Sequence, residues 1–458
     1  MTAGASMAEA KRAMAAGNYA QAYEQLREID LAEIEILSAV RVMVQMATCA
    51  QMLGRPAENI ELHAGALARL TRELRLVPPA MTPEMTTLAL SLAVGARDAP
   101  RAAEFIQILF GDLAPIKSGW RVSPVVPVTK WCRKNGIDVV PLDSIGPAAA
   151  AGNGTWYADI PGAEIVLGWD YVIAPSGEVL EGANYMPPDK SFPFMPHAFC
   201  PSGPAIAHVW PEDVVRMDVD ALFLSVPERH HYGHWLIEFL PRLRAWSLSE
   251  TPRRKLVVSS ALPQKHRDLL ARFGVAREDL IECTLGQRYA FGSLRVVRTG
   301  RANAPHPEDI RYLAAGLSPG EVAVRSKIYF LTRESGTRVP VNMDEVRAVL
   351  KAFGGTEINP ARLTLAEQMN CLRNARAIIG AFGTELYCLF NLPPGAAVIE
   401  LNWNEYEATI FGQTAALAGI VHRLIVCAKA EDRGAATYKR DGDLIVDCAS
   451  LRAALAEL

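Results

Sequence analysis

Residues 375–400 read ARAIIGAFGTELYCLFNLPPGAAVIE, and this stretch decides the fold class. A short apolar run ends at Gly380, a glycine turn continues through Gly383, and a segment of helical length follows. After two prolines, a second apolar run closes on Glu400. The pattern predicts a strand, a glycine turn, a helix and another strand. Such a turn places backbone N–H groups at a helix N-terminus, which favours phosphates, and ligands of open α/β sheets bind at the carboxyl ends of strands. The stretch therefore predicts half of a nucleotide-binding domain.

Length and composition indicate a globular protein of two or three domains. The chain has 458 residues, 50% of them hydrophobic and 21% charged. Its net charge of −3 and the absence of a long basic run exclude nucleic acid as an expected partner. The eight cysteines form no Cys-x-x-Cys pair, so neither a zinc ribbon nor a disulfide framework is expected. Residues 1–19 lack a signal-peptide core, and no stretch reaches the roughly 18 apolar residues of a membrane span. We expect a cytoplasmic protein, with any attachment to the inner membrane being peripheral.

Residues 1–112 have the composition and spacing of an all-α region. Apolar residues recur at three-residue intervals, at Ala20, Tyr23, Leu26 and Ile29. Similar turns at Gly17, Gly54 and Gly95 are spaced by 37 and 41 residues, close to the roughly 34-residue period of tetratricopeptide repeats. A tetratricopeptide-like repeat and an ordinary helical bundle both fit. In either case the region is a module expected to bind a protein partner or a second copy of the chain.

The rest of the chain divides at its prolines and at a change of pattern. Pro115, Pro124 and Pro127 predict a linker over residues 113–127. A first α/β domain over 128–303 begins with β-like segments, and a second α/β domain follows over 304–458. From about residue 226 onward, apolar strands alternate with helical segments, which indicates parallel sheets with crossover helices. The predicted strands include 255–259, 294–298, 327–331 and 377–379. Two α/β domains facing each other over a cleft are the simplest architecture.

Residues 231–243, HYGHWLIEFLPRL, form the second informative run. In a helix, His234 and Glu238 project from one face, and a carboxylate beside an imidazole is a competent general-base pair. The alternative is that His234 caps or packs while Glu238 is solvated. His230 and His234 have the spacing of zinc ligands, but no third ligand is placed, so no metal is predicted.

Arg333 and Arg338 flank a loop after the predicted strand 327–331. Two guanidinium groups at the carboxyl end of a strand can hold phosphate oxygens, whereas the alternative is ordinary surface charge. Asp218-Val219-Asp220 resembles the Asp-x-Asp metal ligands of some sugar transferases. It precedes its predicted strand instead of following it, so we interpret it as structural.

Three ordered blocks resemble glycosyltransferase family 61, whose bacterial members make capsule, lipopolysaccharide and related polysaccharides. The family pattern Asn-Tyr-x-His-Trp-Leu-x-Asp-x-Leu-Pro-Arg falls on residues 231–242. An Arg…Arg-x-x-x-Asn-x-x-Glu block falls on Arg333, Arg338, Asn342 and Glu345. The third block falls on Glu367, Gln368, Ala375, Gly380, Gly383, Leu386, Pro393, Pro394, Gly395 and Glu400. The resemblance covers roughly residues 160–450, and three ordered blocks are far more specific than one.

The resemblance implies the fold called GT-B, with two facing Rossmann-like domains, here carrying an N-terminal helical domain. It implies transfer of a sugar from a nucleotide sugar, most simply a UDP-sugar, to a hydroxyl of a saccharide, lipid-linked or protein acceptor, with inversion. The 128–303 domain would hold the acceptor and the 304–458 domain the donor. Neither a cofactor nor a metal is required, because arginines and a helix terminus supply positive charge.

The same resemblance assigns the site residues. His234 and Glu238 share the work of the base. Substrate binding falls to the remaining residues of the blocks: Arg242, Arg333, Arg338, Gln368, Phe382, Gly383, Thr384 and Glu400. Of these, the arginine pair and the turn over 382–384 would hold the leaving diphosphate, Glu400 would accept from the ribose hydroxyls, and Gln368 would face the nucleotide.

Two departures from the family pattern lead to an alternative. Phe382 stands where the family has His, and Cys388 stands where it has Asn. A phenyl ring cannot hydrogen-bond a diphosphate, so the chain could be a transferase-like scaffold that binds partners through its helical repeats. The presence of His234, Glu238 and Arg333 argues against the scaffold hypothesis, since a scaffold does not need these residues. A metal-using transferase ranks third, resting on Asp218-Val219-Asp220.

Overall fold

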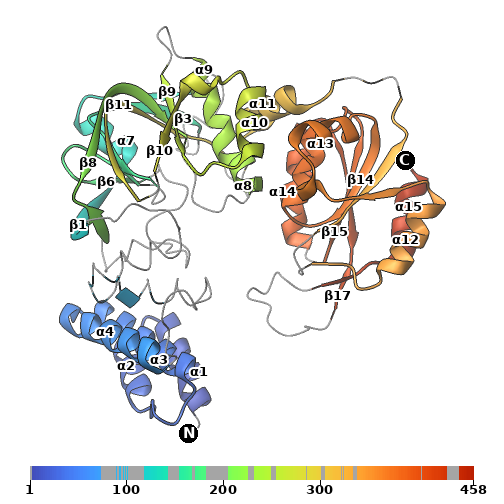
Figure 1. Cartoon of the computed structure of the whole chain (residues 1–458). Coiled ribbons are helices and arrows are strands. Elements are labelled where there is room, and N and C mark those ends of the chain that lie inside the picture. The colour runs from blue at the N-terminus through green and yellow to red at the C-terminus, as the bar shows by residue number, and fades with distance from the viewer. Residues whose placement is uncertain are drawn as a thin grey trace.

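The protein is described by a computed structural model of the whole chain, shown in Figure 1. A helical region comes first and two α/β units follow. Among the described helices, none combines the length and the apolar content needed to cross a membrane. The structure describes residues 3–73, 118–142, 154–167, 171–181, 205–224, 232–248, 254–284, 286–300, 305–320, 324–333, 338–403, 405–430 and 443–458, together with residues 89, 92, 93, 96, 98, 101 and 322.

Four helices make up most of the described helical region: α1 (Ala3–Ala15), α2 (Tyr19–Arg27), α3 (Ile36–Met52) and α4 (Pro56–Glu73). Gly17 and Gly54 follow α1 and α3 with φ angles of 75° and 72°, the left-handed conformation that commonly ends helices. Buried side chains of α1, α2 and α3 form one apolar core. The predicted turns at Gly17 and Gly54 are confirmed. Gly95 lies outside the described residues, and the repeat itself stays a prediction.

The first α/β unit is built on an 11-stranded mixed sheet. Its main path runs β10-β9-β8-β11-β4-β5-β6-β1-β7, and β2 and β3 attach beside β11. The strands are β1 (Ser118–Pro127), β2 (Val139–Pro141), β3 (Trp156–Pro161), β4 (Glu164–Val166), β5 (Tyr171–Ile173), β6 (Val179–Glu181), β7 (Ala205–Pro211), β8 (Val214–Phe223), β9 (Lys255–Ser259), β10 (Leu280–Cys283) and β11 (Arg288–Arg298). Strands β8 to β11 pair in parallel, whereas most other pairings are antiparallel. This sheet differs from the expected Rossmann-like sheet because short connections such as the one between β5 and β6 can join only antiparallel strands.

Strand β1 occupies residues that the prolines assigned to the linker. Residues 118–124 pair with β7, and residues 125–127 pair with β6. Each half of the strand is thus hydrogen-bonded to a different neighbour, and a proline is tolerated in a strand where one edge needs no N–H donor. The linker prediction is therefore wrong for residues 118–127, and residues 113–117 lie outside the described residues. The described part of the unit begins at Ser118, ten residues before the predicted boundary.

Helices complete the first unit at its parallel strands. Between β8 and β9 the chain forms one continuous helical run, with α8 (Tyr232–His234), a π-helical segment η2 (Trp235–Phe239), a 3₁₀ turn η3 (Leu240–Arg242) and α9 (Leu243–Ser247). Between β9 and β10 it forms α10 (Gln264–Arg272) and η4 (Arg277–Asp279), and α7 (Val128–Lys134) follows β1. These crossovers bring successive strands into the same direction, as parallel pairing requires.

The second α/β unit has a five-stranded, fully parallel sheet in the order β13-β12-β14-β15-β16. Its strands are β12 (Lys327–Leu331), β13 (Thr356–Ile358), β14 (Ala375–Ala381), β15 (Ala397–Asn402) and β16 (Val421–Val426). The helices and short elements are α12 (Met343–Ala352), η5 (Pro360–Arg362), α13 (Leu365–Leu372), η6 (Thr384–Asn391), α14 (Glu405–Leu417), β17 (Ala428–Lys429), β18 (Leu444–Ile445) and α15 (Cys448–Ala456). In chain order the strands read 2-1-3-4-5, the doubly wound order of flavodoxin-like sheets. The predicted strands and their parallel arrangement are confirmed.

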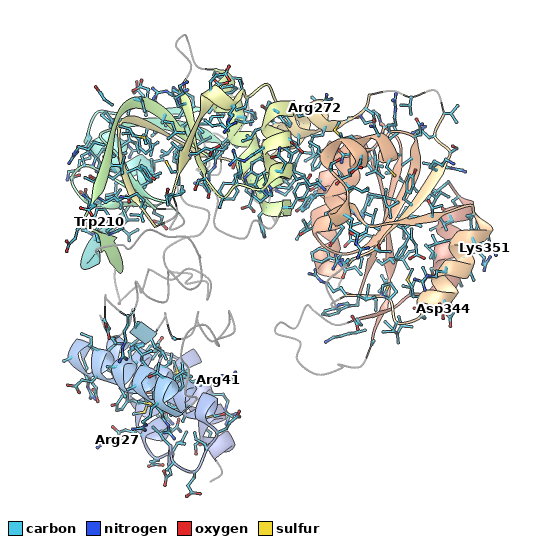
Figure 2. All side chains as sticks on the ribbon, viewed as in Figure 1. Arg27, Arg41, Trp210, Arg272, Asp344 and Lys351 are labelled. Carbon is cyan, nitrogen blue, oxygen red and sulfur yellow. The ribbon has the colours of Figure 1, made fainter. Side chains whose placement is uncertain are left out.

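Helix α12 illustrates how this unit is covered. Val346, Val349 and Leu350 are buried against the sheet, whereas Asp344 and Lys351 point outward (Figure 2). The apolar residues recur at helical spacing on one face, which is the pattern of an amphipathic helix.

The two α/β units share a core. Helix α11 (Pro307–Leu317) connects them, and α10 and α11 lie beside α13 and α14 in Figure 1. One apolar cluster contains Trp235 and Leu269 from the first unit, and Leu386 and Phe411 from the second. The Lys265 ammonium on α10 also donates to the carbonyl oxygens of Pro360 and Leu363 at 3.0 and 3.3 Å. The surfaces on which the predicted site residues lie are thus packed against each other.

Candidate active site

The glycine turn lies at the switch point of the second sheet. Strands β12 and β14 are parallel neighbours, and the chain leaves them in opposite directions along the sheet. Doubly wound sheets bind ligands at the carboxyl edge of this position, because the two following loops separate there. Arg333 follows β12 by two residues, and Gly383 follows β14 by two. The sheet order therefore brings together two residues that are 50 positions apart in the sequence.

Arg333 lies underneath the turn. Its Nη2 donates to the carbonyl oxygens of Ala381 and Phe382 at 3.1 and 2.8 Å, and it forms an ion pair of 2.8 Å with Glu385 Oε2. The Arg333 side chain is only 6% exposed. The guanidinium is thus held by the backbone of the turn, and its charge lies directly beneath the start of η6.

Gly383 leaves room for this close approach. A Cβ atom added to it would lie 1.8 Å from Arg333 Nη2, far inside van der Waals contact. Its φ of 153° is also a conformation that residues with a side chain rarely adopt. The glycine in the sequence pattern therefore has a specific physical cause, which is the arginine packed against the turn.

Arg338 brings a second positive charge to the same turn. Its Nη1 donates to the Phe382 carbonyl oxygen at 3.0 Å, so both arginines share one acceptor. Its φ of 58° is left-handed, which costs a non-glycine residue about 1–2 kcal/mol. Two guanidinium groups and one carboxylate, Glu385, therefore gather at the N-terminus of η6. A helix N-terminus adds partial positive charge, and the combination favours an anion.

The predicted general-base pair is formed in the first unit. His234 Nδ1 and Glu238 Oε1 are 3.1 Å apart across one turn of the helical run. Glu238 is nearly buried, with 6% of its side chain exposed, whereas 43% of the His234 side chain is exposed. The segment between them is π-helical, a distortion found frequently at functional sites. A buried carboxylate against one ring nitrogen fixes the orientation of the imidazole.

A tight contact between the units brings the pair close to the turn. A Cβ atom on Gly233 would lie 2.5 Å from Tyr387 Cε2 and 3.5 Å from Thr384 Cγ2. Gly233 precedes His234, and Thr384 follows Gly383, so α8 packs directly on η6. Burial and the nearby Glu238 carboxylate both raise the pKa of Tyr387. Because adjacent Cα atoms are about 3.8 Å apart, this contact places His234 and Gly383 close enough to line one site.

Arg242 and Gln368 are placed in supporting positions. Arg242 is buried, lies over the Phe239 ring at 4.6 Å and donates to the Phe223 carbonyl oxygen at 3.2 Å. Gln368 is 1% exposed, and its Oε1 accepts from Lys265 Nζ at 2.6 Å. Desolvation at this junction lowers the pKa of Lys265. In this conformation both residues contact neighbouring protein groups, and the Gln368 contact joins the two units.

Glu400 lies inside β15, in register with Gly380 of β14. Strand β15 continues two residues beyond it, and the side chain is fully buried. Asn402 Nδ2 donates to Oε1 at 2.8 Å, and His422 Nε2 lies 2.8 Å from Oε2. Both carboxylate oxygens are therefore bonded within the sheet in this conformation. The sequence-based expectation assumed that the strand ends at Glu400, which the structure contradicts.

The two departures from the family pattern are packed into the protein. Phe382 is half-buried, with its ring edge-to-face with Phe411 at 5.5 Å and the Arg338 guanidinium 5.7 Å from its centroid. Cys388 is buried, and desolvation raises the pKa of its thiol to about 12. Asp218-Val219-Asp220 lies inside β8 instead of before a strand, and Asp220 forms an ion pair of 3.6 Å with Arg254.

Sequence reasoning missed three residues of this site: Lys265, Glu385 and Tyr387. Lys265 lies about a hundred positions from its partners, so no local pattern could reveal it. Glu385 and Tyr387 stand just after the glycine turn. A carboxylate two residues beyond a predicted phosphate-binding glycine was a usable signal, because it opposes anion binding.

One comparison with known proteins matches a family to the part of the chain that carries this site. The family model described as Glycosyltransferase 61 matches residues 232–399. The match begins at the helical run that carries His234 and ends within β15, so it includes the base pair, both arginines and the turn. This part of the chain is similar to glycosyltransferase family 61.

Other comparisons add little. No curated protein matches the chain significantly. Among solved structures, the crystal structure of full-length LpoA from Haemophilus influenzae (monoclinic form 1) is 10% identical to this chain and covers 95% of it and 74% of its own length. The TM-score is 0.16, too low for a conclusion about the fold.

Proposed function

We propose that this protein is an inverting glycosyltransferase that moves a sugar from a nucleotide sugar, most simply a UDP-sugar, to an acceptor hydroxyl in polysaccharide, glycolipid or glycoprotein synthesis. The observation that carries the proposal is the contact between α8 and η6. It joins a His–Glu pair from one α/β unit to a positively charged glycine turn from the other. The family match spans both halves of this arrangement.

The turn is suited to the leaving group. During transfer the bond between the anomeric carbon and the diphosphate oxygen breaks, and the electron pair leaves with the diphosphate. Positive charge arranged beforehand at that position stabilises the transition state, because the charge develops there. Arg333, Arg338 and the start of η6 supply this charge.

The base pair is suited to the acceptor. As the acceptor oxygen forms its bond to the anomeric carbon from the opposite side, its proton must pass to a base. His234 can take the proton while Glu238 stabilises the resulting imidazolium, or Glu238 can act as the base itself. The choice between the two stays open. A GT-B-like arrangement of the two α/β units, with the mixed sheet of the first unit as a departure from that fold, belongs to the same proposal, as do the cytoplasmic location and metal independence.

The test begins with binding and continues to transfer. Nucleotide sugars are screened by thermal unfolding, where a ligand at a hundred times its dissociation constant stabilises the protein by about 2.7 kcal/mol. The donor that stabilises most is then incubated with a panel of saccharide and lipid-linked acceptors, with EDTA or with Mg²⁺. We expect a UDP-sugar to be selected and transfer to be equal in both conditions. Turnover that EDTA abolishes would favour a metal-using mechanism instead.

A second candidate is an inactive, transferase-like binding protein. It is favoured by Phe382, whose apolar ring packs on Phe411 beside the turn. This protein would bind a nucleotide sugar yet neither transfer nor hydrolyse it with any acceptor in the panel. The helical region would then provide the docking surface for a protein partner or a second copy of the chain.

A further inference from the structure

Glu385 introduces a negative charge into the positive turn. It lies in the first turn of η6, and its Oε2 is 2.8 Å from Arg333 Nη2. Its side chain is 23% exposed, whereas that of Arg333 is 6% exposed. The carboxylate is therefore more accessible to solvent than the guanidinium that it contacts. It neutralises one of the two positive charges that converge on the Phe382 carbonyl oxygen.

Arg333 is held by other contacts besides this ion pair. The same Nη2 atom already donates to the carbonyl oxygens of Ala381 and Phe382. The guanidinium also lies so close to Gly383 that even a Cβ atom there would collide with it. Glu385 can therefore leave while Arg333 stays fixed by the backbone, and its partial exposure gives the carboxylate a route toward solvent.

The position of the carboxylate resembles that of a bound anion. It lies at a helix N-terminus, where negative charge is stabilised, and it contacts an arginine of the pair assigned to the diphosphate. A phosphate group bound to Arg333 would be repelled by the neighbouring Glu385 carboxylate. The phosphate and the carboxylate therefore compete for one guanidinium.

We propose that Glu385 is an internal anion that occupies Arg333 in the empty site and that the donor diphosphate must displace. This inference rests on the proposed function for the identity of the donor, but it concerns anion binding and can be tested without turnover. The carboxylate weakens binding of every anion at the turn, so the site retains only ligands with enough negative charge to replace it. A donor with a diphosphate fulfils this condition.

The test compares anion binding in three variants of the full-length protein. Glu385→Gln keeps the shape and removes the charge, and Glu385→Asp keeps the charge. Glu357→Gln is the matched control, because Glu357 pairs with Arg347 at 2.7 Å on the outer surface of the same unit. Calorimetry measures binding of inorganic pyrophosphate and of UDP at constant pH and salt, and thermal unfolding checks that each variant is folded.

The expected result is an affinity of Glu385→Gln for pyrophosphate and UDP about tenfold higher than that of the wild type, as for removal of a charged competitor. Glu385→Asp and Glu357→Gln should bind like the wild type. The inference is overturned if Glu385→Gln binds pyrophosphate equally or more weakly, which would make Glu385 a support for Arg333. It is also overturned if no variant binds pyrophosphate at millimolar concentration. Tighter pyrophosphate binding without any sugar transfer would uphold the inference and contradict the proposed function.

Discussion

The two halves of the candidate site are held in place by different means. In the second α/β unit, the backbone holds the site residues. Arg333 and Arg338 donate hydrogen bonds to carbonyl oxygens of the turn, and Gly383 leaves the space that Arg333 fills. In the first unit, one side-chain contact of 3.1 Å joins His234 to Glu238.

This difference has a consequence for mutation. A substitution at the turn is expected to change anion binding and local stability together, because the groups that we propose to bind the ligand also pack the turn. A substitution in the base pair is expected to change the chemistry while the fold and donor binding persist.

The largest effect is expected from Glu238→Gln, which keeps the side-chain shape and removes its charge. Sugar transfer should fall by about 10²–10⁴-fold, the usual contribution of a general base, while UDP binding persists. His234→Ala should have a similar effect if the imidazole takes the proton and a smaller one if it only positions the acceptor. Initial rates of transfer and calorimetric UDP affinity are the two measurements.

Glu282→Gln is the control for these variants, because it removes a carboxylate of the same unit that pairs with Arg267 at the surface. Wild-type turnover by both Glu238→Gln and His234→Ala would place the base elsewhere.

Gly383→Ala should damage binding and stability together. The new Cβ atom must displace the Arg333 guanidinium, and alanine is strained at the φ angle of this position. We therefore expect a loss of about 2–4 kcal/mol in the free energy of unfolding, together with weaker UDP binding. Gly354→Ala is the matched control in the same unit, since its φ is 68° and no heavy atom lies within 4 Å of the new Cβ. It should lose about 1–2 kcal/mol from backbone strain alone. Equal losses in chemical denaturation would mean that the contact with Arg333 is not important.

Arg333→Ala should weaken UDP binding by about 1.5–3 kcal/mol, as for the loss of a charged hydrogen bond. Arg347→Ala, which removes a half-exposed arginine of α12, should leave the affinity unchanged. Calorimetry measures the UDP affinity of both variants. If the two bind UDP equally well, Arg333 serves only the packing of the turn, and Arg338 with the η6 terminus holds the phosphate.

The smallest effect is expected from removing the helical region. A chain that begins at residue 117 keeps both α/β units, and it should bind UDP with wild-type affinity. Loss of binding by a shortened chain that still unfolds cooperatively would show that the helical region contributes to the site. This outcome would contradict the proposal that the helical region binds a partner while the α/β units alone form the site.

The sequence-based predictions succeeded where a local pattern has one structural solution. Continuous apolar runs at 255–259 and 327–331 became β9 and β12 with the same bounds, because a strand buried on both faces has no polar alternation. The glycine turn after β14 was also predicted. Predictions failed where the bounds of a strand depend on the neighbouring strands with which it pairs. Two prolines did not prevent strand β1, since each part of it pairs with a different neighbour, and Glu400 became a buried core residue because its strand runs further.

The amino-acid sequence by itself determined that this is an α/β protein, that a glycine turn follows a buried strand, and that a His and a Glu share one helical turn. These features depend on residues close together in the chain. Only the tertiary structure decided that Arg333 lies under Gly383, that Lys265 joins the two units, and that Tyr387 packs on Gly233 to bring the turn to the base pair. These contacts join residues between 50 and 154 positions apart. Their partners are chosen by sheet order and domain packing, which no local spacing encodes.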